Sequence, residues 1–239
     1  MILYVNGDSH AAGAEINNTY AFADDDPIIH NNKNPHPENI VDSFGYLLAK
    51  KLDYDFVTDA QSGASNDRIL RTTKEYLEKN NRNIFVLIGW SSFDRKTVIV
   101  NKKEYQFSPG FVADDPDVYH AFKEYIISLD RNEEARLSNY WHGEIYKFHR
   151  ELKENNVKHL FFNTMSFFNN GAVHNNPECL SKYSWNNHYI GSYKQQDTYW
   201  YWLRNRGYTV VNNGYHYGAD AHAAWANRLY NWLTDHQLL

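Results

Sequence analysis

Short apolar runs alternate with segments of helical periodicity along most of the chain. Apolar runs that end at small or polar residues predict buried strands at Ile2–Val5, Phe56–Val57, Ile84–Ile88, His159–Phe162 and Tyr208–Val211. Apolar residues spaced three and four positions apart predict helices over 37–52, 66–79, 118–129, 132–155, 197–206 and 219–233. Strands separated by helices are typical of a parallel sheet with helices on both faces. The pattern therefore predicts an α/β fold, a three-layer αβα sandwich around a central parallel sheet.

Three segments lack both patterns. Residues 11–37 indicate a loop, or a short helix followed by a loop. Residues 96–130 look irregular apart from their one helical stretch, and 169–192 look like an insertion loop. Neither an internal repeat nor a linker-like stretch divides the sequence, so we expect a single domain over residues 1–239.

The composition suits a globular α/β protein and argues against several classes. The chain has 239 residues, of which 42% are hydrophobic and 16% aromatic, enough to fill a sizeable core. A net charge of −5 with no basic stripe argues against a nucleic-acid binder. Cys179 is the only cysteine, which excludes an internal disulfide and a cysteine-based zinc site. The histidines lack metal-ligand spacing, so we expect neither a metal nor a cofactor.

The chain carries no recognisable targeting or membrane segment. Its first residues enter a strand directly, without a basic segment followed by a long apolar one. Its apolar stretches fall well short of the roughly 20 residues that span a bilayer. We therefore expect no signal peptide and no membrane span, and a location in the cytoplasm or within a virus particle.

Small polar residues follow four of the expected strands. In an open parallel sheet, sites form beyond the carboxyl ends of the strands. The segments there are Gly7-Asp8-Ser9, Ser62-Gly63-Ala64-Ser65-Asn66, Gly89-Trp90-Ser91-Ser92 and Asn212-Asn213-Gly214-Tyr215-His216. A serine, glycine turns with free N–H groups and a histidine are what acyl transfer requires. The alternative is that Asp8 or Ser9 only caps the next helix.

These segments resemble the four sequence blocks of the SGNH (GDSL-type) esterases and lipases. Gly7-Asp8-Ser9 resembles the first block, Gly63 in its turn the second, Gly89-Trp90-Ser91-Ser92 the third, and His216-Tyr217-Gly218 to Ala226 the last. The resemblance covers essentially the whole chain, and it extends to phage-encoded SGNH-like proteins. It implies the flavodoxin-like SGNH hydrolase fold. It also implies a serine esterase or O-deacylase, such as a deacetylase, that hydrolyses a small-molecule or glycan ester or an acylated lipid without a cofactor.

Carried over residue by residue, the resemblance assigns roles at three positions. Ser9 is expected to be the nucleophile and His216 the general base. The backbone N–H groups of Ser9 and Gly63 are expected to bind the oxyanion. We further expect His10 and Trp90 to line the substrate-binding site.

Two residues depart from the family pattern. The third block normally supplies an asparagine side chain to the oxyanion, and Ser91 stands there instead. The Ser91 hydroxyl or the side chain of Asn66 would have to replace it. The last block is normally Asp-x-x-His, and Asn213 stands in place of the aspartate. An asparagine does not stabilise a protonated imidazole as a carboxylate does.

Several alternatives follow from these departures. Asp220 and His222 would provide an acid and a base in another register, although their spacing differs from that of the family. The chain could instead be a catalytically weak or inactive member of the fold, used as a binding or structural module, for example in a virion. A flavodoxin-like nucleotide binder is a third hypothesis, but the sequence lacks a glycine-rich phosphate loop.

Overall fold

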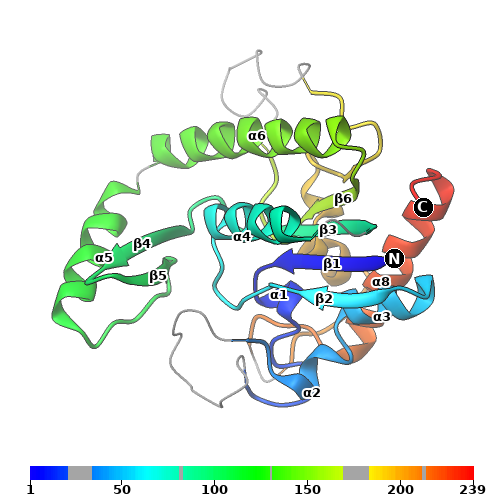
Figure 1. The fold of residues 1–239 in the computed structure, drawn as a ribbon. Coiled ribbons are helices and arrows are strands. Elements are labelled where there is room, and N and C mark those ends of the chain that lie inside the picture. The colour runs from blue at the N-terminus through cyan, green and yellow to red at the C-terminus, as the bar shows by residue number, and fades with distance from the viewer. Residues whose placement is uncertain (21–33, 81–82, 130, 169–182, 212–213) are drawn as a thin grey trace.

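A computed structural model of the protein describes residues 1–20, 34–80, 83–129, 131–168, 183–211 and 214–239. A five-stranded parallel sheet lies at its centre, with strand order β2-β1-β3-β6-β7 (Figure 1). These strands are β1 (Ile2–Gly7), β2 (Asp55–Thr58), β3 (Ile84–Trp90), β6 (Lys158–Asn163) and β7 (Tyr189–Ile190). The α-helices are α1 (Ser9–Ala12), α2 (Pro37–Ile40), α3 (Phe44–Leu52), α4 (Asn66–Lys79), α5 (Pro116–Ser128), α6 (Arg131–Glu154), α7 (Tyr199–Arg204) and α8 (Ala219–Asp235), and a 3₁₀ turn, η1, spans Gln195–Asp197.

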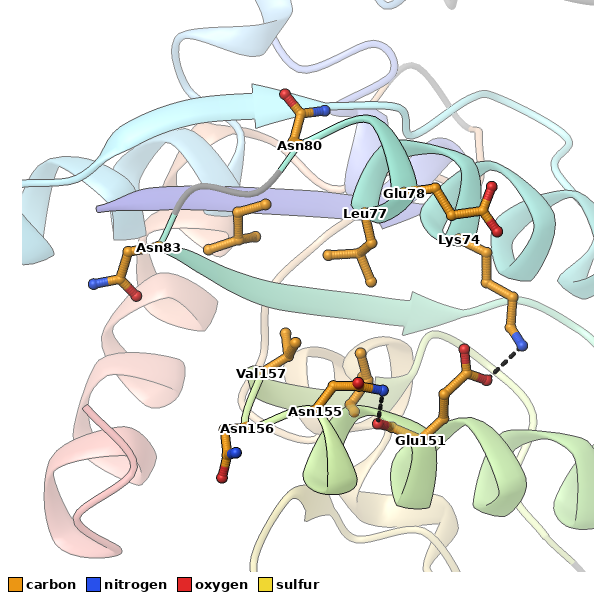
Figure 2. Close-up of a pocket in the computed structure, with 11 residues that line it drawn as sticks. Lys74, Leu77, Glu78, Asn80, Asn83, Glu151, Asn155, Asn156 and Val157 are labelled. Atoms are coloured by element: carbon orange, nitrogen blue, oxygen red, sulfur yellow. Dashed lines mark hydrogen bonds and ion pairs between the residues drawn. The ribbon is translucent and has the colours of Figure 1, made fainter.

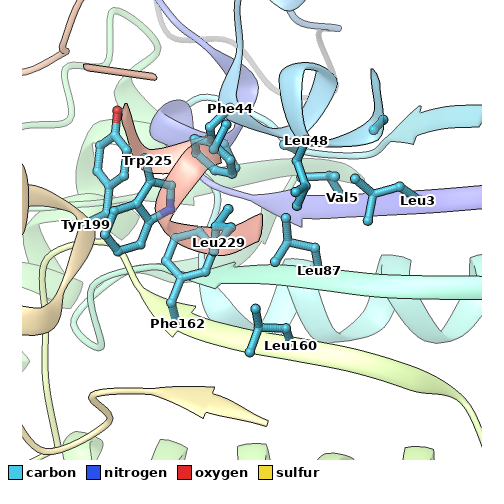
Figure 3. Packing of buried hydrophobic residues seen from close by; sticks show 14 of the residues in the cluster. Leu3, Val5, Phe44, Leu48, Leu87, Leu160, Phe162, Tyr199, Trp225 and Leu229 are labelled. Carbon is cyan, nitrogen blue, oxygen red and sulfur yellow. The ribbon is translucent and has the colours of Figure 1, made fainter. Parts of the chain in front are cut away.

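Successive side chains of the buried strands point to opposite faces of the sheet and belong to two hydrophobic cores, one on each face. In β1, Leu3 and Val5 point to the face covered by α3, α7 and α8. The intervening Ile2 and Tyr4 point to the face covered by α4 and α6. Figure 3 shows the first of these cores, in which Trp225 of α8 lies beside residues of α3, α7 and β6. Burial on both faces explains why these strands read as continuous apolar runs.

The observed architecture confirms the predicted α/β fold, a three-layer sandwich around a parallel sheet. Numbered along the chain, the sheet strands follow the order 2-1-3-4-5, which is the flavodoxin-like arrangement. The four strands predicted from Ile2 to Phe162 are all present. In such a sheet a crevice forms at the carboxyl ends of the two neighbouring strands between which the strand order reverses. Here these strands are β1 and β3.

One predicted strand is absent, and one strand of the sheet was not predicted. Residues 208–211 form no ladder and make only a single antiparallel bridge, between Val210 and Tyr217. The fifth strand of the sheet is β7, which lies within the stretch expected to be an insertion loop. β7 has only two residues, so its pairing with β6 depends on tertiary contacts and leaves no periodic signal in the sequence.

One predicted helix is divided in the structure, and two other helical expectations are met. The predicted helix over 37–52 is divided into α2 and α3, because the Ser43 side chain accepts a hydrogen bond from the Tyr46 N–H and starts a new helix. The predicted helix over 66–79 is α4, with Ser65 as its N-cap. The segment after Ser9 contains the short helix α1.

A β-hairpin occupies part of the stretch expected to be irregular. Strands β4 (Lys96–Val100) and β5 (Lys103–Phe107) pair antiparallel around a turn at Asn101 and Lys102, both at positive φ. Together with α5 the hairpin encloses its own small core of Phe107, Phe111, Val118 and Tyr125. Figure 1 shows the hairpin and α5 beyond the carboxyl end of β1, to one side of the sheet.

Three histidines lie together where α6 ends and where β6 and β7 begin. The His159 Nδ1–H donates to the Val157 carbonyl at 2.8 Å, and the His149 Nδ1–H donates to His159 Nε2 at 2.8 Å. The His188 ring stacks on the His159 ring at 4.4 Å between centroids. Burial lowers the pKa of all three, which favours the neutral form of each ring.

We expect the protein to lose stability as the pH falls from about 6.5 toward about 4. Buried His10 and His222 have pKa values lowered by burial to about 4 and about 3, and the three-histidine group shifts in the same direction. The unfolded chain then binds more protons than the folded one, at a cost on the order of 1 kcal/mol per histidine per pH unit. Melting temperatures measured between pH 7.5 and pH 4.5 check this. His159→Gln should flatten the profile, whereas replacing exposed His120 with Gln should not.

Candidate active site

The turn after β1 presents Ser9 at the carboxyl edge of the sheet. Asn6 fixes the end of the strand: its side-chain N–H₂ donates to the Ile69 carbonyl and to Thr73, and its oxygen accepts from the Gly7 N–H. Asp8 is the N-cap of α1 and accepts from the His10 N–H at 3.0 Å. Ser9 is therefore the first helical residue, and it is 5% exposed.

Glycines occupy two paired positions at this edge, Gly7 of β1 and Gly89 of β3, where a larger residue would clash with its surroundings. Gly7 is paired with Gly89, and a Cβ at Gly7 would lie 2.7 Å from the Gly89 carbonyl oxygen and 2.7 Å from the Ala11 Cβ. A Cβ at Gly89 would lie 2.9 Å from the Phe162 ring. Both contacts are too short for a real side chain, so glycine is required at these positions by packing.

We expect Gly7→Ala to destabilise the protein by about 1–3 kcal/mol, the usual cost of overpacking a well-packed interior. The backbone oxygen it meets belongs to a central strand and has no room to move. Urea denaturation measures the free energy of unfolding directly. A Cβ at Gly110 would meet nothing within 4 Å, so Gly110→Ala should stay within about 0.5 kcal/mol of wild type.

Asp8 is a fully buried carboxylate that joins three segments at the sheet edge. Its Oδ2 accepts from the Thr164 hydroxyl at 2.8 Å and from the Ser91 hydroxyl at 3.1 Å. The Arg95 guanidinium lies 3.4 Å from the same oxygen. These partners come from the ends of β6 and β3 and from the start of the hairpin, so they hold the Ser9 turn from one side.

His216 pairs with a carboxylate that the sequence did not indicate. Its Nδ1 lies 2.8 Å from Glu15 Oε2, and this hydrogen bond lowers the pKa of the Glu15 carboxyl. An ionised carboxylate can only accept, so Nδ1 carries a proton and donates it to Glu15, which makes Nε2 the nitrogen that serves as acceptor in the neutral ring. Glu15 follows α1 closely: the N–H of its neighbour Ala14 donates to the Ser9 carbonyl at 3.0 Å. Glu15, His216 and the Ser9 helix thus meet at one place.

The side chain of His10, the residue after Ser9, packs against His216. Its ring centroid is 5.3 Å from that of His216 and 5.1 Å from that of Tyr199. It is 2% exposed, and burial lowers its pKa to about 4. His10 therefore packs against His216 as a neutral ring beneath the surface, although we had expected it to line the substrate-binding site.

The turn after β2 brings a second backbone donor to this edge. Gln61 N–H donates to the Gly7 carbonyl at 3.1 Å, so the turn runs alongside the end of β1. Gly63 adopts φ +81°, a left-handed conformation that favours glycine. Within the described residues, the N–H groups of Gly63 and Ser9 donate to no acceptor. Both remain available to bind a negatively charged oxygen.

The side chains expected to supply a third oxyanion donor are engaged elsewhere. The Ser91 hydroxyl donates to Asp8. The Asn66 side chain accepts from the Ser91 N–H at 2.8 Å and donates to the Ser91 carbonyl at 3.1 Å, so it fixes the backbone after β3. Trp90 is 0% exposed and packs edge-on against Phe161 in the core under α6, whereas we had expected it to line the substrate-binding site.

The structure also distinguishes between the two candidate bases, His216 and His222. His222 is buried: its Nδ1 accepts from the Phe44 N–H and its Nε2 lies 3.1 Å from the Tyr199 hydroxyl. Asp220 is exposed and accepts from the Ala221 N–H. His222 thus joins α8 to the first residue of α3, whereas His216 is the histidine beside the Ser9 turn. Asn213 lies outside the described residues.

The described residues line several cavities near the sheet. One, of about 430 Å³, lies at the amino end of β3 between the last turns of α4 and α6, where Lys74 and Glu151 form an ion pair (Figure 2). That edge is opposite the Ser9 turn. Another, of about 330 Å³, is lined by Arg95, Lys96 and Trp141 among others, and Arg95 also contacts Asp8.

In the described part of the chain, histidine, cysteine, aspartate and glutamate side chains do not gather in groups of three or more that could hold a metal ion. Among the described helices, none combines the length and apolar character needed to cross a membrane.

Comparison with known proteins assigns the chain to a family. The sequence profile of a family of unknown function, DUF6071, matches residues 23–170, which is more than half of the chain. The chain belongs to this family. The matched region includes the Gly63 turn, the hairpin and α6, and ends before His216. Curated protein sequences gave no match.

Three of the solved structures that are similar to this one are an esterase, TesA and a carbohydrate esterase. A psychrotrophic esterase, EstA from Pseudoalteromonas sp., shares 9% identity over 98% of this chain and 97% of its own, with a TM-score of 0.48. TesA shares 12% over 100% of both chains, with a TM-score of 0.48. A carbohydrate esterase family 2 enzyme from Myceliophthora fergusii shares 14% over 99% of this chain and 66% of its own, with a TM-score of 0.47. At these values the likeness transfers no activity to this chain.

Proposed function

We propose that the protein is a serine esterase of SGNH type, with Ser9 as nucleophile, His216 as general base and Glu15 as the acid that orients it. The observation that carries this proposal is the 2.8 Å contact between His216 Nδ1 and Glu15 Oε2 beside the Ser9 helix. The carboxylate fixes the tautomer in which Nε2 can accept a proton, and it stabilises the imidazolium that forms. Glu15 thus supplies the carboxylate that the asparagine at position 213 lacks.

The reaction divides into two acyl transfers. Ser9 Oγ attacks the ester carbonyl carbon while His216 Nε2 takes the hydroxyl proton, and the N–H groups of Ser9 and Gly63 stabilise the oxyanion. The tetrahedral intermediate collapses, the C–O bond to the alcohol breaks, and His216 returns the proton to the leaving oxygen. Water, deprotonated by His216, then attacks the acyl-serine, and the released acid leaves Ser9 protonated again.

We propose a carboxylic ester of an acylated carbohydrate or lipid as the substrate class. The second candidate is a catalytically weak or inactive member of the fold that acts as a binding module. The Ser91 hydroxyl favours it, because that donor is bound to Asp8 and leaves two backbone N–H groups as the oxyanion donors.

Labelling with a fluorophosphonate probe tests the proposal. The probe should form one covalent adduct, and mass spectrometry of the digested protein should place it on the peptide that contains Ser9. Ser92→Ala, at the same edge of the sheet, should label at the wild-type rate. Absence of an adduct on Ser9 in the folded protein would favour the binding module.

A further inference from the structure

The hairpin makes a buried polar contact with the turn that carries Gly63. Gln106 of β5 is 2% exposed, and Ser65 is 0% exposed. Gln106 Oε1 accepts from the Ser65 N–H at 3.0 Å and from the Ser65 hydroxyl at 2.7 Å. A buried amide oxygen with two donors from one residue fixes that residue closely, because leaving either donor unmatched in the interior costs free energy.

Neighbouring contacts extend this attachment. Thr97 of β4 lies 2.8 Å from the Ser65 hydroxyl, and its own N–H donates to Asp67 at 3.0 Å. Gln106 Nε2 donates to Glu104 at 3.0 Å, which holds the amide in the orientation that presents its oxygen to Ser65. Ser65 follows Gly63 by two residues, so the hairpin determines where the second half of this turn lies.

We propose that Gln106 is a positioning residue, which holds the Gly63 turn so that its N–H group faces the reacting oxygen. This inference rests on the proposed function, because it gives the Gly63 N–H its role as an oxyanion donor. The hairpin is not part of the central sheet, and it packs with α5 around a separate hydrophobic core. It therefore acts on the site through Gln106 and Thr97 at Ser65, and through Arg95 at Asp8.

Gln106→Met tests the proposal, because methionine keeps the length of the side chain and removes the acceptor. We expect kcat for p-nitrophenyl butyrate to fall about 10- to 100-fold, with KM within about twofold, since small misplacements of a catalytic group reach that size. Hydrogen exchange at the Ser65 amide should accelerate, because its acceptor is lost. The double variant Glu104→Gln with Gln106→Glu exchanges amide and carboxylate, keeps the net charge, and should recover most of kcat.

Phe107→Leu is the matched control. Phe107 is buried in the hairpin core next to Gln106 in sequence, and its ring has no polar group that could bind Ser65. It should lower the melting temperature and leave kcat near the wild-type value. An equal fall of kcat in Phe107→Leu would overturn the proposal, as would unchanged kcat and exchange in Gln106→Met. If wild-type Ser9 takes up no fluorophosphonate, the proposed function fails. The exchange rate at Ser65 then decides by itself whether Gln106 holds the turn.

Discussion

Replacing Ser9 with alanine is expected to lower kcat for ester hydrolysis by roughly 10⁶, the size seen when a catalytic triad loses its nucleophile. The hydroxyl has no structural task to lose: it makes no hydrogen bond within the described residues, and Asp8 rather than Ser9 caps α1. The fold should therefore survive the change. Hydrolysis of p-nitrophenyl butyrate, together with thermal unfolding of the same sample, measures both properties.

A Ser9→Ala variant that keeps more than a tenth of the wild-type rate would place the nucleophile elsewhere or point to water as the attacking group. A variant that fails to fold would not separate these cases. Ser9→Thr is the second measurement, because it keeps a hydroxyl on a slightly larger side chain. It should retain the fold and part of the fluorophosphonate labelling that Ser9→Ala lacks.

The second large effect is expected at Glu15. Glu15→Gln should lower kcat by roughly 10⁴, as for the aspartate-to-asparagine change in a serine protease triad. The amide can donate to His216 Nδ1, which favours the tautomer whose Nε2 carries a proton and cannot act as a base. Glu15→Asp keeps the carboxylate and should lose less. Measuring kcat as a function of pH for the wild type, Glu15→Gln and Glu15→Asp gives the size of the fall in each variant.

Two comparisons make this prediction specific. Glu38→Gln removes an exposed carboxylate and should leave kcat unchanged. Asn213→Asp restores the carboxylate typical of the SGNH pattern, and with Glu15 already in that role it should give little gain. A strong gain in Asn213→Asp combined with full activity in Glu15→Gln would assign the acid to position 213 and contradict the role of Glu15.

The sequence predicted those parts of the site that depend on local pattern. Ser9 and Gly63 lie in the turns that follow β1 and β2, so an apolar run and the glycine turn after it suffice to place them at one sheet edge. The Glu15 partner could not be found this way, because it lies 201 residues from His216 in the chain and in a stretch without periodicity. Its position at positive φ reflects tertiary packing.

Other parts of the fold were missed for different reasons. The hairpin had a local signal, the β-branched residues of Thr97–Val100 followed by Asn101, which the expectation of an irregular segment overlooked. The expected role of Trp90 failed because a residue at the end of a central strand has its side chain on a covered face. Adjacency to the site in sequence therefore does not mean exposure to the substrate.

The small core of the hairpin affects how the protein should respond to heat. Four buried side chains hold the hairpin and α5 together, whereas the two cores of the sheet are several times larger. Segments with few buried apolar contacts open locally at a lower free energy than the whole protein unfolds. Opening of the hairpin would release Ser65 and Asp8 from Gln106 and Arg95 while the sheet stays folded. Reversible loss of activity on warming should therefore precede loss of secondary structure.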